Sequence, residues 1–224
     1  MDYYNTLING NPLKQVFREI RVAYGDSPTK DLALEIANVL LKNEDFSGPE
    51  YRFMCWLKHM DIYSHEGLEL PNILNKKDIA EMSIDDFEME FANTEHRKIL
   101  FHEFVATVIK LKAAKHIDQP MEVIIGGSYL DEGNDSPNDI DCIFLIPEKL
   151  WNQNSISFME DFLKISIDLT GKIDFKTLPD NFSLDYFKGY NDISLMANNT
   201  KNRDNGTRMV INDFHPRRVV NVRI

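Results

Sequence analysis

Hydrophobic and polar residues follow one another along the chain in a pattern that predicts both helices and strands. Between residues 95 and 116, apolar side chains recur at helical spacing after Thr94, a residue type that often caps helices. Apolar runs at 121–125 and 139–146 are bounded by turn residues, as is typical of buried strands. On the long helix we expect these residues to face the core: Ile99, Leu100, Phe104, Val105, Val108, Ile109 and Leu111.

The segments before the long helix predict a separate helical region. Apolar residues at helical spacing favour helices at 11–24, at 28–40 and from Pro49 to Met60. A linker-like stretch follows, and Ser83 then has the position of a cap for a short helix through Phe87 and Phe91. We therefore expect a small helical N-terminal module at residues 1–70 and a second domain at residues 71–224.

The segments after residue 147 complete the predicted second domain. A helix is expected at 154–169 and a short alternating strand at 172–176. A further helix is expected at 183–197. Short apolar runs at 209–211 and 219–222 predict strands that either add to the sheet or close over a bound ligand.

The candidate chemistry lies between the first two strands. Strand 121–125 is followed by Gly126-Gly127-Ser128, and glycines there allow backbone to approach a bulky anion closely. Ten residues separate Ser128 from Asp139-Ile140-Asp141, and we interpret the polar part of this segment as a solvated turn. Strand alternation places Asp139 and Asp141 on one side. Because hard divalent cations prefer carboxylate oxygens, the pattern predicts a site for a metal–triphosphate complex.

At these residues the chain resembles the DNA polymerase β-like nucleotidyltransferases, and is most similar to their short bacterial members. Their signature is a strand, Gly-Gly or Gly-Ser, a spacer of about ten residues and two acids one residue apart, and the order of elements over residues 95–177 also fits their core. The resemblance implies an α+β fold with a nucleotidyltransferase-like mixed β-sheet and helices packed on it. It also implies a third carboxylate on a later strand, where Asp174 stands.

The resemblance further implies a reaction and its cofactors. We expect transfer of a nucleoside monophosphate from an NTP to a hydroxyl on RNA, on a protein or on a small molecule. Gly126, Gly127 and Ser128 would hold the triphosphate. Asp139, Asp141 and Asp174 would be both the catalytic residues and the ligands of two Mg²⁺ or Mn²⁺ ions. In this scheme Asp174 also acts as the base for the incoming hydroxyl.

Composition and charge limit the kinds of partner that we expect for the protein. A formal net charge of −11 argues against broad binding of duplex DNA. Residues 201–224 are basic, with six Lys and Arg against two Asp, and either touch phosphates or balance the acidic body. No apolar run is long enough to cross a membrane. Cys55 and Cys142 lie in apolar segments and are expected to be reduced core residues, which favours a cytoplasmic protein.

Two other functions stay open, one outside the enzyme class and one within it. The first is a non-catalytic binding protein, an antitoxin or a nucleotide sensor, whose helical module at residues 1–70 docks a protein partner. Such a role would suit a toxin–antitoxin or defence system. The second is an antibiotic-modifying enzyme, which would use the same carboxylates on a small-molecule hydroxyl.

Overall fold

The structure is a computed structural model, and it describes part of the chain. The described residues are 30–42, 49–64, 79–153, 164–165, 172–182, 184, 187–199, 215–216 and 218–224. The helix expected at 11–24 and the strand expected at 209–211 lie outside them. So does the helix expected at 154–169, apart from the helical residues 164–165.

The chain divides into two compact units. One contains residues 1–73 and 183–215, and the other contains residues 74–182 and 216–224. The first division lies close to the expected boundary at residue 70. Residues 183–215 group with the N-terminal segment, whereas the sequence analysis assigned them to a domain spanning 71–224.

The first unit is helical in its described part. Helix α3 spans Lys30–Lys42, α4 spans Pro49–His59 and α9 spans Phe187–Ala197. Helices α4 and α9 pack together, and the rings of His59 and Tyr190 lie 5.6 Å apart. Two short strands, β5 at Asn198–Asn199 and β6 at His215–Pro216, pair with each other. Phe53, Trp56 and Ile193 are among the buried residues that form the core.

The second unit is built on a five-stranded mixed sheet with the order β1-β7-β2-β3-β4. Its strands are β1 at Ala80–Ser83, β2 at Glu122–Gly126, β3 at Ile140–Ile146, β4 at Ile173–Pro179 and β7 at Val220–Arg223. Strand β2 runs antiparallel to both of its neighbours, while β1–β7 and β3–β4 are parallel pairs. Cys142, like Cys55 in the first unit, is buried and not in a disulfide, as predicted.

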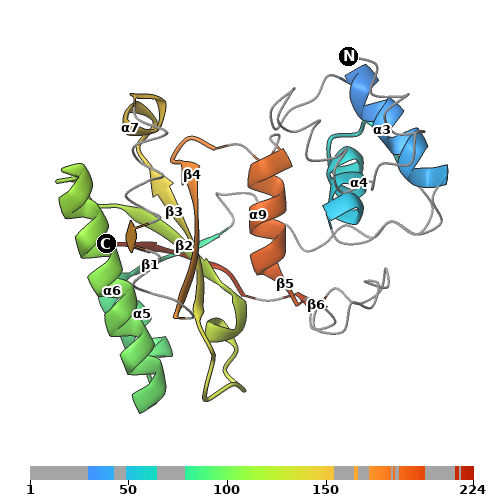
Figure 1. Cartoon of the computed structure of the whole chain (residues 1–224). Coiled ribbons are helices and arrows are strands. Elements are labelled where there is room, and N and C mark those ends of the chain that lie inside the picture. The colour runs from blue at the N-terminus through green and yellow to red at the C-terminus, as the bar shows by residue number, and fades with distance from the viewer. Residues whose placement is uncertain are drawn as a thin grey trace. The chain divides into compact units, whose positions relative to one another are not determined.

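Two helices pack on the sheet through an apolar core. Figure 1 shows α6, at Glu95–Lys115, running along the sheet next to α5, at Ile84–Phe91. Thr94 caps α6 and Ser83 caps α5, and each side chain accepts a backbone N–H three residues on, which confirms both predicted helix starts. The core cluster joins these helices to β2, β3 and β7 and includes Phe87, Phe104, Val123, Phe144 and Val222.

The buried side of α6 differs in part from the prediction. Ile99 and Ile109 were expected to face the core, but their side chains are 49% and 60% exposed. The buried residues step along the helix at intervals of three and four, and this spacing leaves Ile99 and Ile109 on the outer surface. The buried set contains a charged residue: Arg97, Leu100, Phe101, Phe104, Thr107, Val108 and Leu111.

Two shorter helical elements complete the second unit. A 3₁₀ helix, η2, spans Gly127–Leu130 directly after β2. Helix α7 spans Glu148–Gln153 and was not predicted. The mixed sheet with helices confirms the α+β class. None of the helices among the described residues has the length and hydropathy needed to span a membrane.

Candidate active site

Three of the candidate residues lie in one row across adjacent strands. In the β2–β3 pair Gly126 is opposite Asp141, and in the β3–β4 pair Asp141 is opposite Asp174. Neighbouring strands in a sheet are about 4.8 Å apart, so residues in register are lateral neighbours. The β-strand pairing therefore brings together residues that are far apart in sequence, as the resemblance implied.

The two strand carboxylates lie on the sheet face opposite to α5 and α6. Ile140 and Cys142, which flank Asp141, belong to the core cluster beneath these helices. Ile173 also belongs to it, and Phe175 packs against it. Because side chains alternate along a strand, Asp141 and Asp174 point to the other face. Asp141 is half-buried and Asp174 is exposed, so this face is open to solvent near β4.

Gly127 lies directly against the carboxylate of Asp141. Its φ of +73° belongs to the left-handed region that favours glycine. A Cβ placed on Gly127 would lie 1.8 Å from Oδ2 of Asp141, which is far inside van der Waals contact. The site therefore requires glycine at this position for two independent reasons. One is backbone conformation, and the other is the space that the Asp141 carboxylate occupies.

Asp139 lies just before β3 and shares its local environment with another acid. Burial raises the pKa of Asp139, and the negative charge of Asp174 raises it further. Burial also raises the pKa of the Cys142 thiol well above its usual value, with smaller contributions from the charges of Asp141 and Asp174. The charge of Asp174 therefore disfavours ionisation of Asp139, and a bound cation would offset this repulsion.

The segment between the glycines and Asp139 is more than a solvated turn. Asp131, Glu132, Gly133, Asp135 and Ser136 are exposed, as expected. Its backbone, however, is held by the first turn of α6: Thr94 Oγ1 donates to the carbonyl of Asp135 at 3.2 Å, and His96 Nε2 donates to that of Pro137 at 2.8 Å. Arg97, which the sequence analysis did not single out, holds the same segment. The sequence did contain a signal for this role: Arg97 stands at the three- and four-residue spacing of the buried positions of α6.

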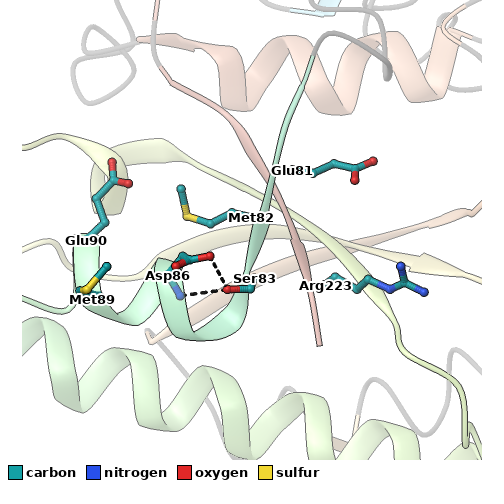
Figure 2. Close-up of a pocket in the computed structure, with 7 residues that line it drawn as sticks. All are labelled: Glu81, Met82, Ser83, Asp86, Met89, Glu90 and Arg223. Carbon is teal, nitrogen blue, oxygen red and sulfur yellow. Dashed lines mark hydrogen bonds between the residues drawn. The ribbon is translucent and has the colours of Figure 1, made fainter.

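A hollow of about 830 Å³ lies at the other edge of the sheet (Figure 2). Side chains from β1, α5 and β7 line it: Glu81, Met82, Ser83, Asp86, Met89, Glu90 and Arg223. Strand β2 lies between its lining strands, β1 and β7, and the strands of Asp141 and Asp174, β3 and β4. The cavity and the carboxylate row are therefore different places, and the chemistry predicted from the sequence belongs to the row.

Comparison with known proteins places the chain in a family. Residues 69–205, more than half of the chain, match the family of unknown function DUF6932. The chain belongs to DUF6932. The DUF6932 region contains all six candidate residues, from Gly126 to Asp174. No curated protein and no solved structure matches the chain.

The candidate residues suit a divalent cation in their chemistry. Three carboxylates supply the hard oxygen ligands that Mg²⁺ and Mn²⁺ prefer, and the repulsion between Asp139 and Asp174 favours a positive charge near them. In the described part of the chain, no three His, Cys, Asp or Glu side chains are already gathered as a metal cluster. The fit therefore rests on the donor types and the strand register.

Proposed function

We propose that this DUF6932 protein is a nucleotidyltransferase with a polymerase β-like fold, which transfers a nucleoside monophosphate from an NTP to a hydroxyl acceptor. The observation that carries this proposal is the row of Gly126, Asp141 and Asp174 across three adjacent strands. Gly127 extends the row, because its backbone lies against the Asp141 carboxylate. A glycine turn suits the anionic part of a nucleoside triphosphate, and the carboxylate pair beside it suits the divalent cation that the triphosphate carries.

Each part of the site has a task in this reaction. The backbone N–H groups of Gly127 and Ser128, with the Ser128 hydroxyl, bind the triphosphate. The acceptor oxygen forms a bond to the α-phosphorus while the bond from that phosphorus to pyrophosphate breaks, and pyrophosphate leaves with the bonding electrons. The acceptor proton passes to a carboxylate. Asp174 suits this step, because it is the exposed member of the row and an acceptor can reach it.

Asp139, Asp141 and Asp174 would hold the divalent cations. When bound, Mg²⁺ or Mn²⁺ would lower the pKa of the acceptor hydroxyl and neutralise charge on the phosphates. The chain contributes the fixed lateral spacing of Asp141 and Asp174, set by the β3–β4 register. It also contributes the half-buried position of Asp139, where burial strengthens electrostatic interactions.

The direct test offers the purified protein each of four labelled NTPs with Mg²⁺ or Mn²⁺. Total RNA, lysate protein and a panel of small-molecule alcohols and aminoglycosides serve as acceptors in parallel. Label should move to one acceptor class and should be lost in Asp139→Asn and Asp141→Asn. Glu132→Gln is the matched control, because Glu132 is exposed in the intervening segment and lies outside the row.

The same experiment separates catalysis from binding. If calorimetry detects ATP with Mg²⁺ but no acceptor is labelled, the protein is a nucleotide-binding protein of the antitoxin or sensor type. If Asp139→Asn and Asp141→Asn transfer label as fast as the parent, the proposed site is wrong. If neither binding nor transfer is detected with any NTP, the nucleotidyltransferase proposal is wrong.

A further inference from the structure

Arg97 is a buried cation whose hydrogen bonds all go to backbone carbonyls. Its side chain is 2% exposed on the sheet-facing side of α6. A guanidinium has five N–H donors, and Arg97 makes five hydrogen bonds to described residues. Because a buried charge is costly unless it is fully hydrogen-bonded, this complete set of partners explains how Arg97 is tolerated in the core.

The carbonyls that Arg97 binds belong to the segment that leads from the glycine turn to the aspartates. Nη1 donates to Tyr129 O, and Nη2 donates to Asp131 O and Asn134 O, each at 2.6 Å. Nε donates to Asn134 O and Nη1 to Phe91 O, both at 3.2 Å. One side chain therefore joins the end of η2, the following turn and the end of α5.

Tyr129 strengthens the same contact from the other side. The Arg97 guanidinium carbon lies 5.2 Å from the centre of the Tyr129 ring, within cation–π range. The Tyr129 hydroxyl donates to the backbone carbonyl of Arg97 at 3.0 Å, and its ring stacks on Phe87. Tyr129 follows Ser128 directly, so these contacts fix the residue next to the proposed phosphate-binding turn.

Together with Thr94 and His96, Arg97 anchors the segment along its length. The first turn of α6 binds backbone carbonyls at five positions: Tyr129, Asp131, Asn134, Asp135 and Pro137. The segment ends at Asp139, so both of its ends belong to the candidate site. The hydrogen bonds leave little freedom in how far apart the glycine turn and Asp139 can lie.

We propose that Arg97 is a positioning residue, which fixes the phosphate-binding turn at Gly126–Ser128 relative to Asp139 and Asp141 by holding residues 129–134 against α6. The anchoring itself follows from the hydrogen bonds, and its effect on substrate rests on the proposed function. Lysine cannot replace arginine here, because an ammonium has three donors and lacks the planar fork that spans several carbonyls.

The anchoring is tested by hydrogen exchange in the full-length protein. In Arg97→Lys, amides in residues 129–138 should exchange at least about tenfold faster, because two donors and the fork geometry are lost. Amides in β3 should keep their protection, since the strand ladder does not involve Arg97. Lys98→Gln is the matched control, because Lys98 is exposed on the same helical turn, and it should leave both regions unchanged.

Two outcomes would overturn the proposal. Unchanged exchange in residues 129–138 would show that Arg97 does not hold the segment. Equally faster exchange in β3 would show a general structural role instead of a local one. Should Arg97→Lys fail to fold, Arg97→Gln makes the same test without an unpaired buried charge, because its neutral amide keeps two donors. It should speed exchange in residues 129–134 and spare β3, and unchanged exchange in residues 129–134 would count against the anchor.

A second readout links the anchor to the site. Binding of Mn²⁺ with ATP, followed by electron paramagnetic resonance, should weaken at least about tenfold in Arg97→Lys and stay at the parent level in Lys98→Gln. Parent-like Mn²⁺ affinity in Arg97→Lys, despite faster exchange, would overturn the positioning role while leaving the anchor. If the parent itself binds neither Mn²⁺ nor ATP, the proposed function fails, and the exchange result still decides the anchor.

Discussion

Acidic side chains gather at two places on the five-stranded sheet, and their surroundings differ. Beside β1, Asp86 accepts a hydrogen bond from Ser83 Oγ at 2.6 Å, and Glu90 pairs with Arg218 (Figure 2 shows both acids). Arg218 in turn lies over the ring of Phe91. At β3 and β4, by contrast, the neighbour of Asp139 is another acid. Asp139 lies just before β3, and the negative charge of Asp174 on β4 adds to burial in raising its pKa.

The comparison distinguishes acids that stabilise the fold from acids whose charges repel each other. Asp86 and Glu90 have local roles in a helix cap and an ion pair, so the fold explains their presence. Asp139 and Asp174 repel each other and gain nothing from that repulsion in the chain alone. An acid whose ionisation is disfavoured by burial and by a second acid, in a site where Gly127 has a positive φ, indicates a function instead of a structural role.

The largest effect should follow from removing a carboxylate of the row. Asp141→Asn should lower nucleotidyl transfer at least about a hundredfold. Mutation of residues that only support a metal ligand lowers activity by about 10–100-fold, and loss of a direct ligand should lower it more. Its melting temperature should fall by no more than about 2 °C, because a neutral amide removes repulsion. Glu90→Gln should leave transfer unchanged. Equal activity losses in the two variants would erase the contrast between the two acidic groups.

Gly127→Ala should impair transfer through the Asp141 side chain. The added methyl would meet the Asp141 carboxylate and force it to rotate away, and the φ of +73° would cost about 1–2 kcal/mol of unfolding free energy. We expect about a tenfold to hundredfold loss of transfer with the protein still folded. Urea unfolding and the labelled-NTP assay measure the two effects. Gly133→Ala is the control, because a Cβ added at Gly133 would lie 3.5 Å from the nearest atom, Oδ1 of Asp131.

Ser83→Ala should affect stability alone. Ser83 caps α5 by accepting the N–H of Asp86 at 3.1 Å, and loss of such a cap costs about 1 kcal/mol. Chemical denaturation should show this decrease, and nucleotidyl transfer should stay at the parent level. Ser83→Asp should recover most of the lost stability, because aspartate is also a good cap. A loss of transfer in Ser83→Ala at full folding would link the β1 edge to the site.

The smallest effect concerns the exposed pair of Glu103 and Lys172, whose Oε1 and Nζ atoms lie 2.8 Å apart. The hydrogen bond from Lys172, and then its charge, lower the pKa of Glu103 below its ordinary 4.5. A lowered pKa in the folded state stabilises the protein above about pH 4.5, and this contribution disappears as pH falls through the folded value. Glu103→Gln should therefore be slightly less stable at pH 7 and equal to the parent at pH 3. A larger deficit at pH 3 would contradict this assignment.

Features that depend on neighbouring residues could be predicted from the sequence. The start of α6 followed from Thr94 and that of α5 from Ser83, since capping involves residues only three positions apart. Strand β3 followed from its apolar run. That Asp139 and Asp141 lie on one side stays a prediction, because Asp139 precedes the strand. Placing Asp174 in register with Asp141 needed the resemblance, because a parallel pairing across a crossover leaves no local signal.

Features that depend on distant contacts escaped the prediction. Strand β1 is short and mostly exposed, and its pairing with β7 is what makes it a strand. Arg97 was overlooked because a charged residue normally marks the outer side of a helix, whereas here backbone carbonyls satisfy it in the core. For the same reason, Ile99 and Ile109 were wrongly assigned to the buried side.

The position of β7 has a consequence for how the protein folds during synthesis. Val220–Arg223 lies between β1 and β2, so the register that joins Ala80 to Val220 cannot form until this late segment has left the ribosome. Until then β1 and one edge of β2 have unpaired backbone, a state prone to aggregation. Chains that stall or are cut before Val220 should therefore depend on chaperones.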